Sequence, residues 1–485
     1  MNLALVRTLI FATAFSLVTS LYAQTASEKA TMQFRYEVET ILNDPAFHAT
    51  ITGIKIVSLD NDEVLYERNA SILLRPASTT KLFTTTTALR VLGTGYSFAT
   101  EMLADSVSTD GNIVGNLYVK GSGDPDFNSA LLDSMIAGLV KKGIRMITGD
   151  IIGDVSFFDD KRWGNGWMWD DEPSVDAPYI SALSINRNCV RVEATPGTLP
   201  GDPVHVSIEP ATAYVTTENN ATTVSDTAES TLEISRKYVQ RLNAITVTGN
   251  LGASSKPRHE LITVLSPENY FLTLTREALT RAGITVQGKI GLARTSSRAV
   301  LLARNLQPID SMMVFLNKQS DNLSAENTLK TIGAVSVGAP GSTKNGLTMV
   351  RKVQASWGID STSFLQVDGS GVSHYNLIAP EAFVKLLTGM YRSRDMFDIF
   401  FISLPIAGVN GTLSGRMKGT TAENNMHAKT GTLSGVTTLS GYVRTQDSEM
   451  LAFSIMMQNF IGSPDPFRRA QDAIGAAMAS LHGRK

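Results

Sequence analysis

Three short motifs, widely separated along a chain of 485 residues, constrain its fold more than any other feature. They are S-T-T-K at residues 78–81, S-D-N at residues 320–322 and K-T-G at residues 429–431. Each motif alone is expected by chance in a chain of this length. In this order they supply the serine, lysine and amide groups that nucleophilic acyl transfer requires in one site. We therefore expect a fold that brings the three segments together.

The first motif contains a nucleophile and a base. A serine hydroxyl is a weak nucleophile until a base takes its proton, and Lys81 follows Ser78 by three residues, one helical turn away. Residues 82–92 are typical of a buried helix, which places Ser78 at a helix N-terminus, where free N–H groups favour negative charge. Lys81 acts as a base only when neutral, and burial together with a second cation, Lys429, would lower its pKa. The alternative is a capping serine beside a solvated lysine.

The second motif is predicted on a short connection between two helical stretches. The hydroxyl of Ser320 and the carboxamide of Asn322 could there pass a proton to a leaving amine and hold the amide of a substrate. Asp321, between them, is expected to point elsewhere. The alternative is a polar turn that caps the second helix.

The third motif opens a β-rich stretch. Residues 52–58 and 63–67 predict a hairpin, and residues 436–443 and 450–457 predict two antiparallel strands that follow K-T-G. At the edge of such a sheet, the cation of Lys429 suits a substrate carboxylate. The alternative is an exposed edge strand protected by its lysine.

The residues that follow Lys429 have separate expected roles. The hydroxyls of Thr430 and Thr432 would join Lys429 in holding a carboxylate. Gly431 would remove a side chain where a ligand must approach the backbone. The backbone N–H of Thr432 could form an oxyanion hole with that of Ser78.

These motifs and their neighbours resemble one known family over most of the chain. The chain is similar to the D-alanyl-D-alanine carboxypeptidase/endopeptidase family, the low-molecular-mass class C penicillin-binding proteins. His374 departs from the family pattern, which leads us to expect a basic residue there. The segments that carry the resemblance are residues 75–82, 121–125, 166–171, 320–323, 368–371, 404–408, 411–413, 428–433 and 439–443.

The resemblance implies both a fold and an activity. The implied fold is α+β and transpeptidase-like, with an antiparallel sheet flanked by helices and large β-rich inserted domains. The implied activity is that of a serine-type D-Ala-D-Ala carboxypeptidase, with DD-endopeptidase activity, on peptidoglycan stem peptides and without a cofactor. Ser78 would form the acyl-enzyme, and β-lactam antibiotics would be covalent inhibitors.

The spacing of the motifs indicates the domain organisation. Ser78 and Ser320 are 242 residues apart, whereas β-lactamases place these motifs much closer together. The implied insertion argues against a β-lactamase, and the intact motifs argue against a non-catalytic cell-wall-binding protein, which are the two alternative functions. The expected divisions are a signal peptide at 1–23, a catalytic domain of 24–97 plus 293–485, and an inserted region at 98–292 with two nested β-rich domains.

Asp171 is a candidate for substrate selection. Carboxylates are rarely buried without a partner, so Asp170 and Asp171 either face water or meet a cation. In the resembled family, an acidic residue of the inserted domain can meet the free ammonium group of a diamino acid in the stem peptide. Asp171 matches that residue best by position. We interpret the neighbouring tryptophans as local core, with sugar stacking as the alternative, and they are Trp163, Trp167 and Trp169.

The N-terminus predicts export. Arg7 precedes a mostly apolar run at residues 9–22, which is typical of a secretory signal peptide, and we expect cleavage after Ala23. The run is too short and too rich in Thr and Ser for a membrane span. Cys189 is the only cysteine, so no intramolecular disulfide forms, and we interpret it as a buried apolar residue. These features predict a periplasmic protein.

Charge and histidine spacing exclude other partners. A net charge of −2 gives no basis for nucleic-acid binding, and the six histidines lack the close spacing of metal ligands. A C-terminal helix carries an apolar stripe that we expect to pack on the sheet, with peripheral membrane association as the alternative. The stripe consists of Phe467, Ala470, Ile474, Ala477, Met478 and Leu481.

Overall fold

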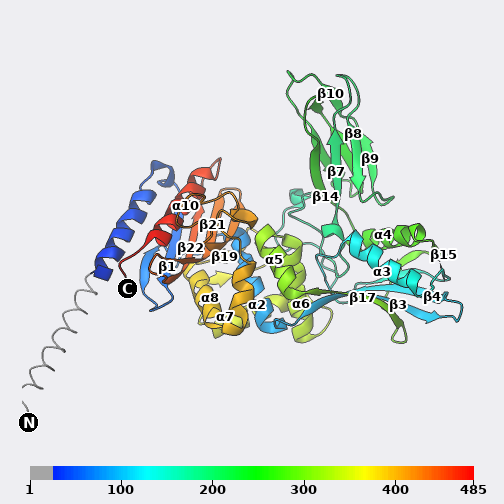
Figure 1. The fold of residues 1–485 in the computed structure, drawn as a ribbon, viewed down its shortest axis with the longest axis horizontal. Coiled ribbons are helices and arrows are strands. Elements are labelled where there is room, and N and C mark those ends of the chain that lie inside the picture. The colour runs from blue at the N-terminus through cyan, green and yellow to red at the C-terminus, as the bar shows by residue number, and fades with distance from the viewer. Residues whose placement is uncertain (1–25, 485) are drawn as a thin grey trace, which may run out of the picture.

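The computed structural model describes residues 26–484 (Figure 1). The predicted signal peptide lies outside the described residues. The described chain forms a body of helices around a large β-sheet, which contains both ends of the described chain, and an inserted region that extends from it (Figure 1). All three motifs lie in the body.

A five-stranded antiparallel sheet forms the centre of the body, with the order β2-β1-β22-β21-β20. The bounds of its strands are β1 Ile51–Ser58, β2 Val64–Arg68, β20 His427–Leu433, β21 Val436–Arg444 and β22 Met450–Gln458. The predicted hairpin is confirmed as β1 and β2, and K-T-G lies on the edge strand β20. Helices cover both faces of the sheet, so β22 is buried throughout and its sequence is almost continuously apolar.

One face of the sheet is covered by a helix at residues 26–42 and by α10 (Asp465–Ser480). All six residues of the predicted C-terminal stripe are buried. Phe467 and Ile474 share an apolar core with Phe34 of the N-terminal helix. The prediction that this stripe packs on the sheet is confirmed, so the stripe does not face a membrane. No helix within residues 26–484 has the length and apolar character that a membrane span requires.

The other face carries the helices that hold the first two motifs. Their bounds are α2 Lys81–Leu92, α5 Ile309–Gln319, α6 Asn322–Val337, α7 Thr343–Ser356, α8 Pro380–Arg392 and α9 Arg394–Ser403. α2 is buried and contains four consecutive threonines. The first three donate to nearby carbonyls, as Thr85 Oγ1 does to the Lys81 carbonyl over 2.8 Å, and the fourth, Thr87, accepts from Gln354 Nε2 over 3.4 Å. Such bonds satisfy hydroxyl groups that would otherwise be costly to bury. Short elements complete the body, and they are η1 Pro45–Phe47, η2 Ala77–Thr80, η5 Gly411–Leu413, β18 Phe364–Leu365 and β19 Leu377–Ile378.

The inserted region begins with a seven-stranded mixed sheet, in which β15-β5-β4-β3-β17 lie in order, β6 pairs with β4, and β16 pairs with β6. The bounds are β3 Ser97–Val107, β4 Ile113–Gly121, β5 Met146–Ile147, β6 Ile151–Asp154, β15 Thr285–Val286, β16 Ile290–Leu292 and β17 Val300–Pro308. Two helices that the sequence did not predict, α3 (Ser129–Lys141) and α4 (Pro267–Arg281), pack against it.

The inserted sheet continues beyond the predicted boundary at residue 292. β17 pairs with β3 as far as Pro308, and α5 of the body starts at the next residue, Ile309. No polar linker separates the two, because a single continuous segment leaves one sheet and enters the helical body. The sequence therefore carried no local signal of this boundary.

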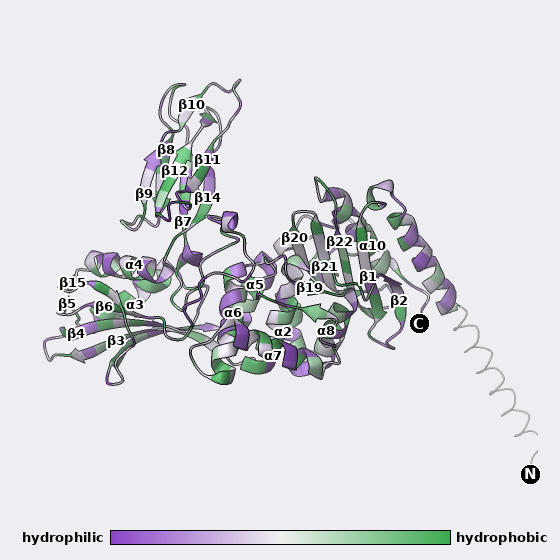
Figure 2. Cartoon of the chain, turned by 180° about the vertical axis from the view of Figure 1, so that it is seen from behind, coloured by the Kyte–Doolittle hydropathy of each residue, from purple (hydrophilic) through white to green (hydrophobic). Residues whose placement is uncertain are grey.

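A second, all-β module projects from the first (Figure 1). Its strands are β7 Cys189–Thr195, β8 His205–Glu209, β9 Thr216–Asn219, β10 Thr222–Val224, β11 Glu233–Arg236, β12 Ala244–Thr248, β13 Asn250–Gly252 and β14 Arg258–Thr263. They form three small sheets. β12 is hydrophobic (Figure 2), and its Ile245 and Val247 belong to the same buried cluster as Phe271 of α4. The two modules of the insert therefore share one core.

Candidate active site

Ser78 lies in the single 3₁₀ turn η2, which leads directly into α2. The preceding Ala77 has a left-handed backbone, with φ +49°, which is a costly conformation for a residue other than glycine. Thr80 Oγ1 holds the turn by donating to the Ala77 carbonyl over 2.8 Å. Ser78 is half-buried and lines a cleft of about 510 Å³. The nucleophile predicted at a helix N-terminus is thus in the turn just before that helix.

Lys81 is fully buried at the first position of α2 and points back to Ser78. Its Nζ lies 3.0 Å from Ser78 Oγ, 2.5 Å from Asn322 Oδ1 and 2.7 Å from the Ser370 carbonyl oxygen. Three contacts match the three positions around an amine nitrogen, so the side chain has one defined orientation. The structure therefore brings together the predicted base and the predicted nucleophile.

Lys429 enters the same site from β20. Its Nζ donates to Ser320 Oγ over 2.8 Å and to the Thr430 carbonyl over 2.9 Å. Ser320 ends α5 in a left-handed conformation, with φ +61°, and lines the cleft together with Ser78. All three motifs thus meet at one place, although they are far apart in the chain.

Burial lowers the pKa of both lysines. It is the largest cause of the fall in the pKa of Lys81 from 10.5 to about 8, and nearby carboxylates, with Asp368 first among them, oppose it. For Lys429, burial and then the charge of Lys81 hold the pKa well below 10.5. The predicted repulsion between the two lysines is mutual, and it appears as a cause of the fall in the pKa of Lys429. A pKa near 8 gives Lys81 the neutral form that a base needs at moderately alkaline pH.

The S-D-N motif is joined to the inserted region through two of its residues. Asn322 Nδ2 donates to the backbone carbonyl of Asp176 over 2.6 Å, while its Oδ1 accepts from Lys81. Asp321 points elsewhere, as predicted: it caps α6 and forms a 2.5 Å ion pair with Arg187 of the insert. The carboxamide that was predicted to hold a substrate amide therefore also links Lys81 to the inserted chain.

The edge strand β20 runs closely past the Ser78 turn. A Cβ on Gly431 would lie 2.9 Å from the Ser78 nitrogen and 2.3 Å from Thr438 Oγ1. Glycine is thus required for contact between two parts of this chain, and because Gly431 also lines the cleft, its role in the approach of a ligand stays a prediction. The same contact brings the backbone of β20 beside the Ser78 amide, which an oxyanion hole from Ser78 and Thr432 requires.

Thr430 and Thr432 both line the cleft. Thr430 Oγ1 donates to Thr412 Oγ1 over 2.7 Å, and Arg468 Nη2 donates to Thr432 Oγ1 over 3.2 Å. Sequence reasoning gave neither Thr412 nor Arg468 a role: Thr412 lies in a segment that carried the resemblance, and Arg468 lies outside every such segment. Hydroxyl groups beside the buried cation of Lys429 can bind a carboxylate.

Two buried carboxylates behind Lys81 were also missed. Glu326 Oε1 accepts the N–H groups of Gly369 and Ser370 over 2.8 Å each, which positions the Ser370 carbonyl that receives Lys81. Asp368 accepts four hydrogen bonds from its surroundings. Burial, followed by the charge of Asp368, raises the pKa of Glu326 to about 8. The D-G-S-G segment at residues 368–371 contributed to the family resemblance, but its sequence did not indicate that Glu326 and Asp368 hold the backbone behind Lys81.

Asp171 lines the same cleft as Ser78. It lies in the short turn η3 (Trp169–Asp171), and its Oδ2 accepts the N–H of Met168 over 2.7 Å. Burial is the largest cause that raises its pKa. Asp170 and Asp176 line the cleft as well, so the wall that the insert contributes is acidic.

The tryptophans near Asp171 differ in environment. Trp167 is buried, and its Nε1 donates to Asp368 over 3.0 Å. Trp163 is half-buried and packs edge-on against Trp167. Trp169 is 69% exposed, and its ring lies beside Tyr238 of the all-β module, with 6.1 Å between ring centroids. The local-core interpretation is therefore confirmed for Trp167 and wrong for Trp169, which lies on the turn at the rim of the cleft.

Cys189 and His374, which the sequence also singled out, both contact other parts of the chain. Cys189 is buried, and burial raises the pKa of its thiol to about 12, so the interpretation as a core residue is confirmed. His374 Nδ1 lies 3.4 Å from Arg75 Nη1 at the position where a basic residue was expected. Within the described part of the chain, no three His, Cys, Asp or Glu side chains gather to hold a metal ion.

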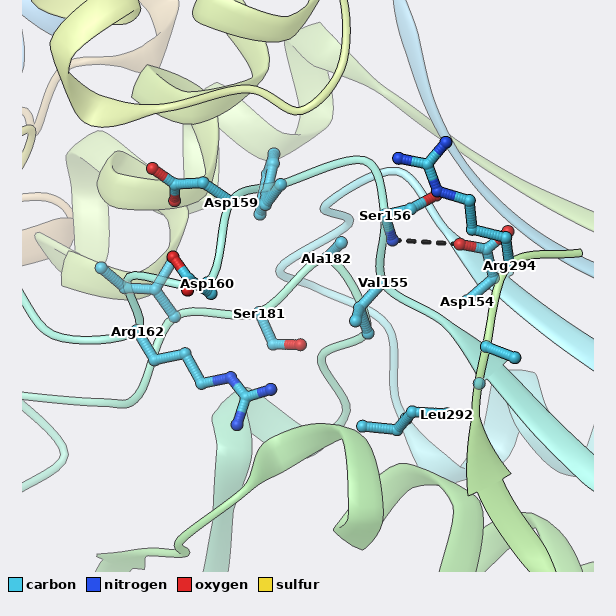
Figure 3. Close-up of a pocket in the computed structure, with 14 residues that line it drawn as sticks. Asp154, Val155, Ser156, Asp159, Asp160, Arg162, Ser181, Ala182, Leu292 and Arg294 are labelled. Carbon is cyan, nitrogen blue, oxygen red and sulfur yellow. Dashed lines mark hydrogen bonds between the residues drawn. The ribbon is translucent and has the colours of Figure 1, made fainter.

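A second cavity of about 270 Å³ lies where the insert meets the body (Figure 3). Arg162 and Arg294 approach it from different sides, and Asp154 accepts the N–H of Ser156 over 3.0 Å (Figure 3). Arg162 pairs with Glu268 of α4, and Asp159 in the lining pairs with Lys330 of α6. The pair of Asp159 and Lys330 ties the insert to the helix that begins with Asn322, and the pair of Arg162 and Glu268 holds the insert together beside it, so we interpret this cavity as a structural junction.

Comparisons with known proteins agree with this geometry. The D-alanyl-D-alanine carboxypeptidase of Actinomadura sp. strain R39 is 36% identical over 475 residues, which cover 95% of this chain and 87% of that protein. The carboxypeptidase DacB of Haemophilus influenzae is 30% identical and covers 83% of this chain and 84% of its own. The crystal structure of penicillin-binding protein 4 from H. influenzae matches with a TM-score of 0.80 and 27% identity, over 90% of this chain and 97% of that one.

The same H. influenzae protein has also been solved in complex with a β-lactam, and that structure matches with a TM-score of 0.77 and 26% identity. These likenesses confirm the predicted α+β fold, with its flanked antiparallel sheet and large insertion. The model of the D-Ala-D-Ala carboxypeptidase 3 (S13) family matches residues 34–481, nearly the whole described chain. The chain therefore belongs to the D-Ala-D-Ala carboxypeptidase 3 (S13) family of peptidases.

Proposed function

We propose that this chain hydrolyses the terminal D-Ala-D-Ala bond of peptidoglycan stem peptides through an acyl-enzyme on Ser78, and also cleaves D-Ala cross-links as a DD-endopeptidase. One observation carries the proposal: the buried Nζ of Lys81, with a pKa of about 8, lies 3.0 Å from Ser78 Oγ. A nucleophile and its base within hydrogen-bond reach are the basic requirement for covalent acyl transfer. β-Lactams would acylate the same serine.

Acylation begins with neutral Lys81. Lys81 takes the proton of Ser78, and Ser78 Oγ forms a bond to the carbonyl carbon of the penultimate D-Ala. The oxyanion is held by the N–H groups of Ser78 and Thr432. As the C–N bond breaks, the proton passes through Ser320 to the nitrogen of the leaving amine, so that Lys81 becomes neutral again. A water molecule then hydrolyses the ester and restores Ser78.

Substrate position depends on groups on both sides of Ser78. Lys429, Thr430 and Thr432 hold the carboxylate of the leaving residue, because a buried cation and two hydroxyls meet there. Asn322 holds Lys81 and orients the substrate amide. Asp171, on the acidic wall from the insert, meets the free ammonium group of the diamino acid in the acyl part of the stem peptide.

We also propose a periplasmic location. The support is the apolar run at residues 9–22 after Arg7 and the absence of a second cysteine to pair with Cys189. Association with a membrane would be peripheral at most.

Digestion of purified peptidoglycan tests the function directly. The products are separated into monomers, dimers and tetrapeptides by chromatography and mass. Carboxypeptidase activity converts pentapeptides to tetrapeptides with release of D-Ala, and endopeptidase activity converts dimers to monomers. A preparation that binds peptidoglycan but changes neither the ratio of pentapeptides to tetrapeptides nor the ratio of dimers to monomers would favour a non-catalytic wall-binding protein. Rapid release of hydrolysed penicillin would favour a β-lactamase.

A further inference from the structure

A third cavity adjoins the catalytic cleft along β20. Its volume is about 500 Å³, and it shares Thr412, Thr430 and Thr432 with the cleft that contains Ser78. The remainder of its lining comes mainly from the chain after η5 and from the first two turns of α10. The two hollows therefore meet at the threonines that are proposed to hold the carboxylate of the leaving residue.

Three arginines line this cavity. Arg416 is fixed by Asp472, 2.6 Å away, and by the backbone carbonyl of Arg468. Arg468 donates to Thr432 Oγ1, and the Asp465 carboxylate lies 3.8 Å from its guanidinium. The two acids of the lining are thus each beside an arginine.

Arg469 is different from its two neighbours. It is exposed and lines the cavity, and its side chain has no hydrogen bond or ion pair to another residue of the described 26–484. Its positive charge is therefore not balanced inside the protein. A guanidinium group presents several donors in a planar arrangement that matches a carboxylate.

The position of the cavity determines which substrates extend into it. When the leaving residue is a terminal D-Ala, its carboxylate ends the substrate at Thr430 and Thr432. When the leaving residue is the diamino acid of a cross-link, the same carboxylate is present, but the rest of a second stem peptide continues beyond it. That second peptide needs a path that starts at the two threonines, and the cavity starts there.

We propose that this cavity is the subsite for the second, amine-side stem peptide of a cross-link, and that Arg469 binds the free C-terminal carboxylate of that peptide. The proposal rests on the proposed endopeptidase function and names the subsite that this function requires. Arg468 connects the two sites, because it contacts Thr432 and also lines the cavity. The subsite forms no covalent bond; the leaving amine departs from it with the proton supplied through Ser320.

Binding to the Ser78→Ala protein tests the proposal without turnover. Calorimetry would compare three ligands: a monomeric stem peptide that ends in D-Ala-D-Ala, a cross-linked dimer, and the same dimer with the amine-side C-terminal carboxylate amidated. We expect the dimer to bind more tightly than the monomer. Amidation should weaken dimer binding about two- to fivefold, the range of one accessible ion pair.

Charge reversal of Arg469 provides the matched variant. On the Ser78→Ala background, Arg469→Glu should remove the preference for the dimer and leave monomer binding unchanged. Arg444→Glu is the control, because Arg444 is exposed at the end of β21 and lines neither the cleft nor the third cavity.

Equal affinity for the dimer and the monomer would overturn the proposal, as would a dimer preference that survives Arg469→Glu. Failure of the proposed function is a separate result, because it is read from penicillin acylation and peptidoglycan digestion by the protein with Ser78 intact. If the protein cleaves dimers but Arg469→Glu has no effect, the proposed function stands and the proposed subsite is wrong.

Discussion

The guanidinium of Arg187, in the inserted region, lies 2.5 Å from the carboxylate of Asp321, the middle residue of the S-D-N motif. Asp321 is 1% exposed and also caps α6, the helix that begins with Asn322. Arg187 adopts a left-handed backbone, with φ +57°, to reach it. One arginine thus connects the inserted region to the residue next to Asn322, the side chain that contacts Lys81.

Arg187→Ala should destabilise the protein and slow acylation together. Removal of one member of a largely buried ion pair leaves Asp321 unpaired, which costs about 3 kcal/mol in the free energy of unfolding. The matched control is Arg281→Ala, which breaks an exposed pair with Asp133 and should cost less than about 1 kcal/mol. Urea unfolding and the rate of labelling by penicillin measure the two effects. Normal stability of Arg187→Ala would mean that the pair does not hold the insert.

The pH dependence of acylation should reflect Lys81. The folded pKa is lowered from 10.5 to about 8, so the neutral base becomes abundant as pH rises through 8 and not through 10.5. Below pH 8, kcat/KM for acylation should fall about tenfold per pH unit, because the protonated lysine cannot accept a proton. The titratable groups around Lys81 are Asp368, Asp321, Glu326, Asp176 and Lys429. A rate that stays constant down to pH 6 would exclude Lys81 as the base.

Glu326 should act through the backbone that it holds and not through its charge. Its pKa of about 8 makes it mostly neutral at pH 7, and a glutamine retains an oxygen for the N–H groups of Gly369 and Ser370. Glu326→Gln should therefore acylate at a near-normal rate with an unchanged pH profile. Glu326→Ala should lose about 2–4 kcal/mol of stability, because it leaves a cavity and two unpaired N–H groups. A large shift of the pH profile in Glu326→Gln would show that the Glu326 carboxylate is charged in the active enzyme.

Asp171→Asn should change the choice of substrate. The measurement is the ratio of kcat/KM for a stem peptide with a free amino group on its diamino acid to that for the acetylated peptide. Loss of a charge-assisted hydrogen bond of about 1–3 kcal/mol should collapse this ratio. Asp170→Asn is the matched variant, because Asp170 lines the same wall. If the ratio is unchanged in Asp171→Asn, the carboxylate only holds its own turn through Met168.

Features with a short-range pattern could be predicted from the sequence. Two strand-like runs, at residues 52–58 and 63–67, predicted the hairpin β1-β2, and the stripe from Phe467 to Leu481 predicted a helix packed on the sheet. The three motifs predicted which groups meet, because nucleophilic acyl transfer needs a serine beside a base and a cation. The structure places Lys81, Ser320, Asn322 and Lys429 around Ser78 accordingly.

Features that depend on contacts between distant segments could not be predicted in this way. β17 resembles any short strand, and only its pairing with β3, about 200 residues earlier in the chain, assigns it to the insert. Glu326 lies in an ordinary helical pattern, and its role appears only when Gly369 and Ser370 fold against it. Gly431 was correctly identified as a position of close approach, but the partner is the Ser78 turn itself.

The most direct test of the account is the mass of the protein after brief exposure to a penicillin, followed by peptide mapping. The account predicts one added β-lactam per chain, on the peptide that contains Ser78, and no adduct on folded Ser78→Ala protein. An adduct that persists in Ser78→Ala, or that maps to another serine, would contradict the central claim that Ser78, activated by Lys81, is the nucleophile.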